Sequence, residues 1–362
     1  MEGLFITTER VPFIMAVNHG SLRIIANPDV LEEDHLPDHL LDREDKIAEI
    51  ERYLSPILKK QRPLHLWLYG DPGTGKTATA RYVLEKMRRK SGIKGIYVNC
   101  WQHNSLYSIL DYLTAELRIL RAEEQRTARK LEKFQQYIKE EPFLLILDEV
   151  DQPSPKERAS IIYTFCCLPK VGLINISNSC NPLFELNGRV KSRLNPQLVA
   201  FNAYTSEQLT AILTERAEEA LVKGSYSPKM LRRITQLVRG DARMAVQTLK
   251  KTAWLAESER ANKITDSHVR KAWSSTQEFE TREKLSNLTT DHKILYGIVK
   301  YQGEILSSDL RQLYLLDCSR AKRRPIAERT FSDYVNDLKT AGLALVERAR
   351  VRGKVRLVRT VK

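Results

Sequence analysis

The fold of this 362-residue chain is decided by the stretch Leu66-Trp67-Leu68-Tyr69-Gly70-Asp71-Pro72-Gly73-Thr74-Gly75-Lys76-Thr77. A short apolar run, a glycine-rich turn and a helix-forming run after it predict a strand, a loop and a helix. The loop fits the pattern G-x-x-x-x-G-K-[ST] at every fixed position. Glycines let backbone N–H groups wrap around phosphates, and the helix directs its N-terminal amides at the same anion. The stretch predicts a phosphate-binding loop, because a chance glycine-rich turn would not need both flanking elements.

The pattern of the loop also predicts which of its residues contact the phosphates and the metal ion. Lys76 is expected to reach the β and γ phosphates of a nucleotide, and the Thr77 hydroxyl to bind Mg²⁺. The predicted nucleotide-binding residues here are Gly70, Asp71, Pro72, Gly73, Thr74, Gly75, Lys76, Thr77 and Ala78.

A second apolar run, residues 143–147, leads directly into Asp148 and Glu149. Such a run is typical of a central parallel strand buried on both faces, and ligands bind at the carboxyl end of strands in these sheets. Asp148 is therefore expected to hold the Mg²⁺ shell, and Glu149 to orient or deprotonate the attacking water. The alternative is an acidic strand end followed by an ordinary turn.

Further strands are predicted over residues 95–100, 172–177 and 198–201. The second of these ends in Asn178, whose side chain is expected to hydrogen-bond the attacking water or the γ-phosphate. Helices are predicted over 46–58, 105–120 and 122–139. The alternating strands and helices predict an α/β fold with a parallel sheet.

The pattern becomes entirely helical after Thr205. Helices are predicted over 206–221, 228–238, 241–256 and 265–282, which together form a small all-helical domain. Asp241 is a natural N-cap, so Arg243 lies in the first turn of the third helix and is expected to reach across a cleft. The alternative is a surface arginine.

The net charge is +14, and much of the excess lies at the C-terminal end: thirteen Lys or Arg but only four Asp or Glu follow from Arg320. Such a charge points to a polyanionic partner. Helices over 291–301, 307–315 and 329–341, followed by strands over 343–348 and 355–359, predict a winged helix.

In a winged helix the third helix lies in the major groove of DNA, and the hairpin contacts the backbone or the minor groove. A domain used only for protein contacts is the alternative. The candidates for base contacts on the helix are Arg329, Thr330, Ser332, Asp333 and Asn336. The candidates for phosphate or minor-groove contacts on the hairpin are Arg348, Arg350, Arg352 and Lys354.

Composition excludes several other classes of protein. Five cysteines without a C-x-x-C pair argue against a disulfide framework and a zinc ribbon. Pro37 breaks the helix that would align His35 with His39 for a metal. No apolar run reaches membrane-spanning length and no signal peptide is evident, so we expect no membrane partner and a cytoplasmic, nucleoid-associated protein.

Together these features resemble the archaeal replication initiators, relatives of the largest eukaryotic origin-recognition subunit and its cell-division-cycle loader partner. The resemblance runs from about residue 27 to the C-terminus. It is carried by the phosphate loop and by Leu36-Pro37, Arg43-Glu44, Tyr97-Val98-Asn99, Asp148-Glu149-Val150-Asp151, Ile176-Ser177-Asn178, Arg189-Val190-Lys191-Ser192-Arg193-Leu194 and Gly240-Asp241-Ala242-Arg243-Met244-Ala245.

The resemblance implies an AAA+ base over residues 27–203, a helical lid over 204–285 and a winged helix over 286–362, after an N-terminal arm over 1–26. It also implies that Asn178 and Arg243 are the first and second sensors, and that Arg193, in preference to Arg189, is the arginine finger. Leu36, Pro37 and Arg43 are implied to contact the nucleotide, and the insertion over 102–137 to touch DNA.

The implied function is that of an ATPase, slow and Mg²⁺-dependent, that recognises double-stranded origin DNA. The resemblance also implies, as partners, the replicative minichromosome maintenance helicase, which it helps to load, and paralogous initiator subunits. The alternative is a non-hydrolysing, ADP-bound regulator of replication or transcription. The presence of all four residues Lys76, Asp148, Glu149 and Arg243 favours an ATPase over a site that cannot hydrolyse ATP. A clamp-loader-like subunit is disfavoured, because it would have no evident use for a basic C-terminal winged helix.

Overall fold

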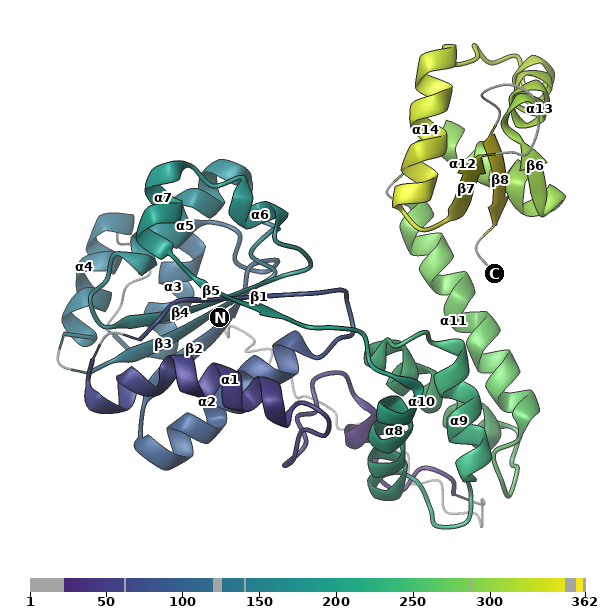
Figure 1. Ribbon diagram of the computed structural model, residues 1–362. Helices are drawn as coiled ribbons and strands as arrows, with labels where there is room; N and C mark the ends of the chain where they lie inside the picture. The colour runs from purple at the N-terminus through teal and green to yellow at the C-terminus, as the bar shows by residue number, and fades with distance from the viewer. Residues whose placement is uncertain are drawn as a thin grey trace, which may run out of the picture. The chain divides into compact units, whose positions relative to one another are not determined.

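A computed structural model describes residues 23–61, 63–119, 126–139, 141–286, 288–348 and 356–360 of the chain (Figure 1). The chain divides into two compact units between Val269 and Arg270. This division lies ahead of residue 285, where the lid was expected to end, and the domain limits stay a prediction.

The first unit is built on a five-stranded parallel sheet in the order β2-β3-β4-β1-β5. Every strand that the sequence predicted is present. Their bounds are β1 Leu66–Tyr69, β2 Lys94–Asn99, β3 Phe143–Asp148, β4 Val171–Ser177 and β5 Gln197–Ala200. The α/β prediction is thus confirmed.

The two faces of the sheet are covered by different helices (Figure 1). Because side chains alternate along a strand, Leu66 and Leu68 pack on one face and Trp67 on the other. The first face carries α1 (Glu44–Leu54) and α2 (Lys76–Ser91); the second carries α3 (Leu106–Glu116), α4 (Thr127–Tyr137), α5 (Pro155–Cys166) and α7 (Gly188–Leu194). Both faces are apolar, which explains why the strands read as continuous apolar runs.

Several helices differ from the prediction, and among them α7 and the short helix α6 (Asn181–Phe184) were not predicted. The helix expected over 46–58 ends at Leu54 and continues as the 3₁₀ helix η2, Ser55–Lys59, where Pro56 removes a backbone donor. Helix α5 was not predicted, although Ser154 caps it by accepting from the Glu157 amide and Pro155 occupies its first turn.

The lid helices of the first unit are α8 (Ser206–Ala220), α9 (Pro228–Leu237) and α10 (Ala242–Ser258), close to their predicted bounds. A segment from the N-terminal side lies against them: Ile25 pairs with Leu221, and the 3₁₀ helix η1, Pro28–Leu31, follows. Residues 1–22 of the predicted arm lie outside the described residues. Among the helices that the structure describes, none combines the length and the hydropathy that a membrane span needs.

The second unit contains most of α11 (Asp266–Ser286), followed by three helices and a small sheet. These elements are α12 (Thr290–Gln302), β6 (Glu304–Leu306), α13 (Ser307–Arg320), α14 (Glu328–Thr340), β7 (Ala344–Arg348) and β8 (Arg356–Thr360). The antiparallel sheet has the order β6-β8-β7, and Phe331, Val335 and Leu338 of α14 enter the shared core. Three helices and an antiparallel hairpin are the elements that the sequence predicted for a winged helix; strand β6 was not predicted.

Candidate nucleotide site

A cavity of about 500 Å³ opens where the carboxyl ends of the sheet strands face the lid. Of the six predicted catalytic residues, all but Arg193 line it: Lys76, Asp148, Glu149, Asn178 and Arg243. So do the predicted nucleotide-binding residues Leu36, Pro37, Pro72, Gly73, Thr74, Gly75, Thr77 and Ala78. Residues from five separate parts of the chain therefore meet at one place.

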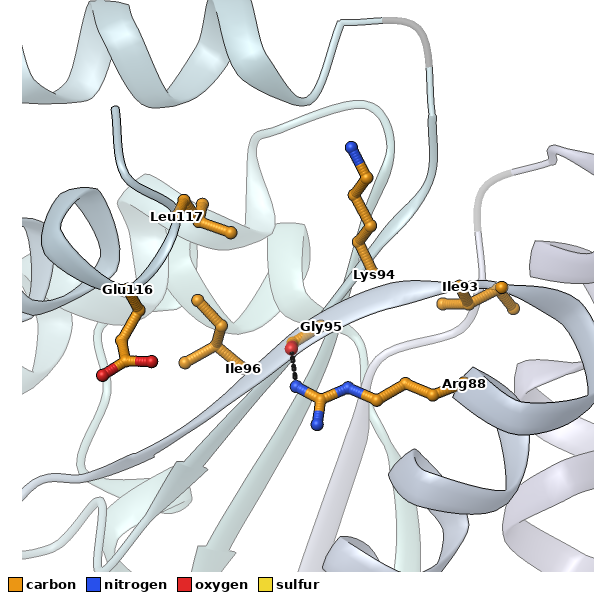
Figure 2. A pocket seen from close by; sticks show the side chains of 8 residues that line it. Arg88, Ile93, Lys94, Gly95, Ile96, Glu116 and Leu117 are labelled. Atoms are coloured by element: carbon orange, nitrogen blue, oxygen red, sulfur yellow. Dashed lines mark hydrogen bonds between the residues drawn. The ribbon is translucent and has the colours of Figure 1, made fainter. Parts of the chain in front are cut away.

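A second cavity, of about 360 Å³, lies at the start of β2 (Figure 2). Arg88 donates to the carbonyl of Gly95 there, next to Lys94 and Glu116. This end of the sheet is opposite the carboxyl ends at which parallel sheets bind ligands. The cavity beside Lys76 is therefore the candidate functional site.

Lys76 is held at the centre of the phosphate loop. Its Nζ donates to the carbonyls of Gly70 and Asp71, at 2.6 and 2.9 Å, and to Asn178 Oδ1 at 3.3 Å. Burial lowers the pKa of Lys76, while Asp148 opposes that shift. The ammonium thus lies among oxygen acceptors, in the position from which it can exchange one of them for a phosphate oxygen.

The Thr77 hydroxyl donates to Asp148 Oδ2 at 2.7 Å, and the Tyr97 hydroxyl donates to the same oxygen at 2.9 Å. A hydroxyl and a carboxylate are the hard oxygen ligands that Mg²⁺ prefers, and Mg²⁺ usually takes its other ligands from water and phosphates. Over the described residues no group of three or more His, Cys, Asp and Glu could hold a metal without such help. The donor set fits Mg²⁺ bound together with a nucleotide.

Glu149 directly follows β3 with a φ of 51°, a left-handed conformation that is costly for a residue with a Cβ. Its amide donates to Asp148 Oδ1 at 2.9 Å, which holds the turn. Burial raises the pKa of the Glu149 carboxyl, and the neighbouring carboxylates of Asp148 and Asp151 raise it further. The turn directs a carboxyl with increased proton affinity into the cavity.

Two glycines allow the lid to approach the phosphate loop. A Cβ on Gly73, whose φ is +72°, would lie 1.9 Å from Asp241 Oδ1, and a Cβ on Gly75 would lie 2.4 Å from the Tyr204 hydroxyl. The amide of Ala242 donates to the Gly73 carbonyl at 3.0 Å. The first turn of α10, which carries Arg243, is therefore fastened to the loop.

Arg43 has a different place from the one the resemblance implied. It is buried beneath the loop and does not line the cavity; its guanidinium donates to the carbonyls of Thr74 and Asn202, at 2.8 and 3.1 Å. The same group stacks 3.6 Å from the centre of the Tyr204 ring. Gly70 and Asp71 also lie outside the lining and contribute their carbonyls to Lys76. Arg43 thus supports the loop from behind.

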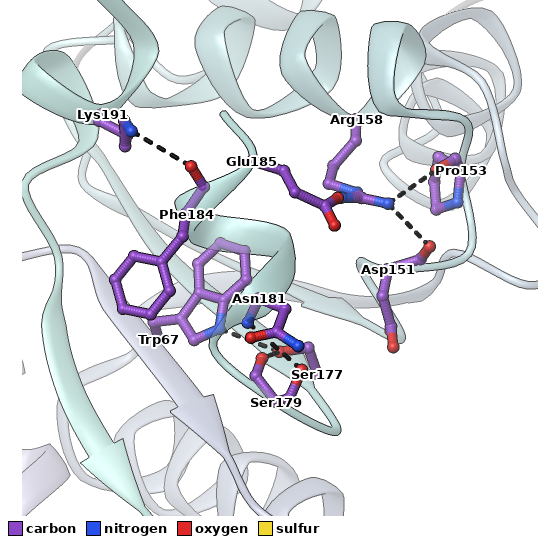
Figure 3. A network of polar contacts seen from close by, with 10 residues as sticks. All are labelled: Trp67, Asp151, Pro153, Arg158, Ser177, Ser179, Asn181, Phe184, Glu185 and Lys191. Atoms are coloured by element: carbon purple, nitrogen blue, oxygen red, sulfur yellow. Dashed lines mark hydrogen bonds and ion pairs between the residues drawn. The ribbon is translucent and has the colours of Figure 1, made fainter. Parts of the chain in front are cut away.

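A polar network fixes the loop that follows β4 and carries Asn178 (Figure 3). Trp67 Nε1 donates to Ser177 Oγ at 2.9 Å, and Ser177 Oγ donates to the Ser179 carbonyl at 2.5 Å. Asn178 is exposed between these two serines, with its amide oxygen toward Lys76. The sequence did not indicate that Trp67 has this role.

The same view shows Arg158 of α5 joining two loops (Figure 3). Its guanidinium pairs with Glu185 at 2.8 Å and donates to the Asp151 carbonyl at 3.1 Å. Glu185 follows the short helix α6, Asn181–Phe184, and precedes α7, which carries Arg189 and Arg193. Neither arginine lines the cavity, and both are exposed. Their assignment as arginine finger stays a prediction.

On α14 the predicted DNA contacts divide into two groups. Arg329, Asp333 and Asn336 are exposed, opposite the apolar face, whereas Thr330 and Ser332 lie at its flanks and are half-buried. Thr330 and Ser332 therefore face away from the apolar stripe less fully than the other three, and all five base contacts stay a prediction. The pattern also missed Arg356 of β8, which donates to Asn336 Oδ1 at 2.8 Å.

On the hairpin, Arg348 is exposed at the end of β7. Arg350, Arg352 and Lys354 lie outside the described residues. In the insertion over 102–137, the fully buried Lys130 side chain pairs with Asp111 and joins α4 to α3. Lys130 thus has a structural role, holding α4 against α3. The DNA contacts of the insertion stay a prediction.

Comparison with known proteins agrees with this architecture. The Cdc6 AAA+ ATPase-type lid domain matches residues 210–274, and the AAA domain matches residues 59–167. An ORC1-type DNA replication protein of Pyrococcus furiosus is 31% identical over 93% of this chain and 86% of its own length. ORC1-type DNA replication protein 1 of Sulfolobus acidocaldarius is 30% identical over 89% of this chain and 85% of its own.

Among solved structures, the Aeropyrum pernix ORC1 protein in complex with DNA superposes with a TM-score of 0.71 at 27% identity. The match covers 93% of this chain and 94% of that one. The sequence and structure matches thus span the phosphate loop, the lid and the second unit. The chain belongs to the Orc1/Cdc6-type family of AAA+ DNA replication initiators.

Proposed function

We propose that this chain binds ATP and ADP with Mg²⁺ in the cavity beside Lys76, hydrolyses ATP slowly, and binds replication-origin DNA through its second unit. The observation that carries this proposal is the convergence of Lys76, Asp148, Glu149, Asn178 and Arg243 on one cavity. These residues supply a cation for phosphates, a carboxylate for the metal, a base and two polar sensors.

Binding follows from the phosphate loop. The amides at the start of α2 and the Lys76 ammonium would hold the phosphates, and Thr77 with Asp148 would hold Mg²⁺. When bound, Mg²⁺ neutralises charge that develops between the β and γ phosphates. Leu36 and Pro37 line the same cavity with apolar side chains and would contact the nucleoside.

Hydrolysis would use the two strand tips. Glu149 would orient a water molecule and take its proton, which requires that the carboxyl be ionised. Asn178 would donate its amide to the water or the γ-phosphate while its oxygen stays near Lys76. Arg243 would contact the γ-phosphate from the lid. The position of α10 would therefore depend on whether ATP or ADP is bound.

Arg193 would act on a neighbouring nucleotide site rather than on its own. It is exposed in the last turn of α7 and lies outside the lining of the cavity. A second copy of the chain or a paralogous initiator subunit would provide that neighbouring site. Turnover by the isolated chain is accordingly expected to be slow.

DNA binding would use α14 and the β7–β8 hairpin. Arg329 and Asn336 are exposed for base edges, and Arg348 for phosphate. The relative from Aeropyrum pernix, whose structure includes DNA, supports this role. Through origin DNA the chain would help to recruit or load the replicative minichromosome maintenance helicase.

The first test compares the full chain with Lys76→Ala and with Lys90→Ala, which removes an exposed lysine of the same helix. Binding of fluorescent ADP and release of phosphate from ATP are measured with Mg²⁺. We expect both to be lost only in Lys76→Ala. Binding without any turnover by the unmodified chain would favour the non-hydrolysing, ADP-bound regulator instead.

The second test measures affinity for a duplex from the source genome's origin region and for a shuffled duplex across a salt series. Backbone binding weakens with salt on any sequence, whereas base readout leaves a gap on the order of 10³-fold. Equal affinities at every salt concentration would contradict origin recognition.

A further inference from the structure

The short acidic segment Glu32-Glu33-Asp34 lies at the cavity and is fixed to the lid. Arg216 of α8 donates to the carbonyls of Val30 and His35, at 2.7 and 3.0 Å, on either side of this segment. The segment therefore belongs structurally to the lid, although it precedes the base in the sequence.

Glu33 uses both carboxylate oxygens on α10. Gln247 Nε2 donates to Oε1, and Arg243 Nε lies 3.8 Å from Oε2. Residues 243 and 247 are four apart, so they lie on the same face of the helix, one turn from each other. Glu32 makes a different contact, an ion pair with Lys250 at 2.7 Å. Only Glu33 of this pair of acids therefore engages the second sensor.

Arg243 is also close enough to the phosphate loop to affect its charges. Burial lowers the pKa of Lys76, and Arg243 contributes to that shift. Burial raises the pKa of Glu149, and Arg243 opposes it. Arg243 thus lies near the carboxylate of Glu33 and lines the same cavity as Lys76 and Glu149, in which a nucleotide would bind.

We propose that Glu33 is a specificity-determining residue that competes with the terminal phosphate of a nucleoside triphosphate for Arg243, and so weakens the preference for triphosphate over diphosphate. This inference rests on the proposed nucleotide site. A carboxylate and a phosphate are alternative acceptors for one guanidinium. A diphosphate leaves the Glu33–Arg243 pair intact, whereas a triphosphate must compete with it.

The size of the effect follows from exposure. The side chains of Arg243 and Glu33 are 55% and 50% exposed, and ion pairs between exposed groups are weak. Removing the competing carboxylate is therefore expected to change the ratio of affinities by about two- to fivefold. Competition of this size tunes the response to the ratio of ATP to ADP without blocking ATP.

The experiment measures the affinities of the full chain for ADP and for a non-hydrolysable ATP analogue, both with Mg²⁺, by isothermal titration calorimetry. Glu33→Gln is expected to raise affinity for the analogue about two- to fivefold relative to ADP. Glu32→Gln removes an equal charge one residue away and is expected to leave the ratio unchanged. The Glu33→Gln effect is expected to vanish when Arg243→Gln is already present.

Each other outcome identifies what has failed. An unchanged ratio in Glu33→Gln, or an equal change in the Arg243→Gln background, would overturn competition for Arg243. Glu33→Ala provides a second variant, and thermal unfolding verifies that each variant is folded. If the unmodified chain bound neither nucleotide, the proposed nucleotide site itself would be wrong, and this inference with it.

Discussion

The nucleotide site and the exposed face of α14 differ in how firmly the fold positions their residues. Lys76 and Asp148 are 8% and 5% exposed and lie at the ends of elements whose other residues form the core. Arg329 and Asn336 are exposed on one helix, and Asn336 is further oriented by Arg356 from a separate strand. The core thus sets the geometry of a site at the ends of buried strands, whereas the exposed face of α14 depends on contacts between surface side chains.

The largest effect expected in this comparison is at Glu149. Glu149→Gln keeps the shape of the side chain and removes the base, so hydrolysis should fall by about 10²- to 10⁴-fold while nucleotide binding persists. Phosphate release and fluorescent ADP binding are measured on the same protein. The control, Glu141→Gln, alters an exposed acid just before the other end of β3. Unchanged hydrolysis in Glu149→Gln would mean that another group positions the water.

The pH profile of hydrolysis tests the same residue without a mutation. Burial raises the pKa of Glu149, so this carboxyl gains its proton at a higher pH than an ordinary glutamate. As pH falls through that raised pKa the base is lost, and the rate should drop about tenfold per pH unit below it. A profile whose acid limb lies at or below the ordinary glutamate pKa would contradict this role.

Gly73→Ala tests whether nucleotide binding needs the close contact between the phosphate loop and the lid. The new Cβ would lie 1.9 Å from Asp241 Oδ1 at a φ of +72°, so either the loop or the first turn of α10 must move. We expect nucleotide affinity to fall about tenfold or more, and the protein to lose roughly 1–3 kcal/mol of stability.

The matched control for this change is Gly92→Ala. Gly92 has a similar φ of +65°, but its Cβ would meet no atom within 4 Å. It should therefore reproduce the backbone strain without the loss of nucleotide affinity. Equal nucleotide affinity in the two variants would show that the contact between Gly73 and Asp241 does not matter for binding.

Arg329→Ala tests the exposed face of α14. If Arg329 contacts a base as proposed, its loss should weaken binding to the origin duplex about tenfold and reduce the gap from the shuffled duplex, as expected for a contact worth ~1–3 kcal/mol. Lys339→Ala removes the same charge near the other end of the helix. A loss that is equal on both duplexes would assign Arg329 to the phosphate backbone.

The smallest effect is expected at Arg356. Arg356→Ala removes the hydrogen bond that orients Asn336 Oδ1. The preference for the origin duplex over the shuffled duplex should fall by about fivefold, because one hydrogen bond contributes about 1 kcal/mol. Arg359→Ala is the control on the same strand, where the arginine pairs with Glu347. Equal changes in both variants would show that only charge matters at this hairpin.

Local pattern was sufficient for the five strands of the first unit, for most helices and for the positions of Lys76, Thr77, Asp148 and Glu149. Each of these residues is adjacent to a strong apolar run or a glycine pattern, which determines the element and the end at which the residue lies. The position of Arg43 could not be predicted in this way. The local sequence does not indicate whether a charged residue ahead of a helix faces a ligand or the back of a loop.

By itself, the sequence determined a parallel α/β base with a phosphate loop, helices after it and a basic C-terminal unit, because periodicity and glycine spacing are local properties. Only the tertiary structure decided that Arg43 supports the loop, that Arg158 joins two loops, that Glu33 engages Arg243 and that Arg356 orients Asn336. These contacts join residues that are distant along the chain. Their geometry arises from packing, which no short stretch encodes.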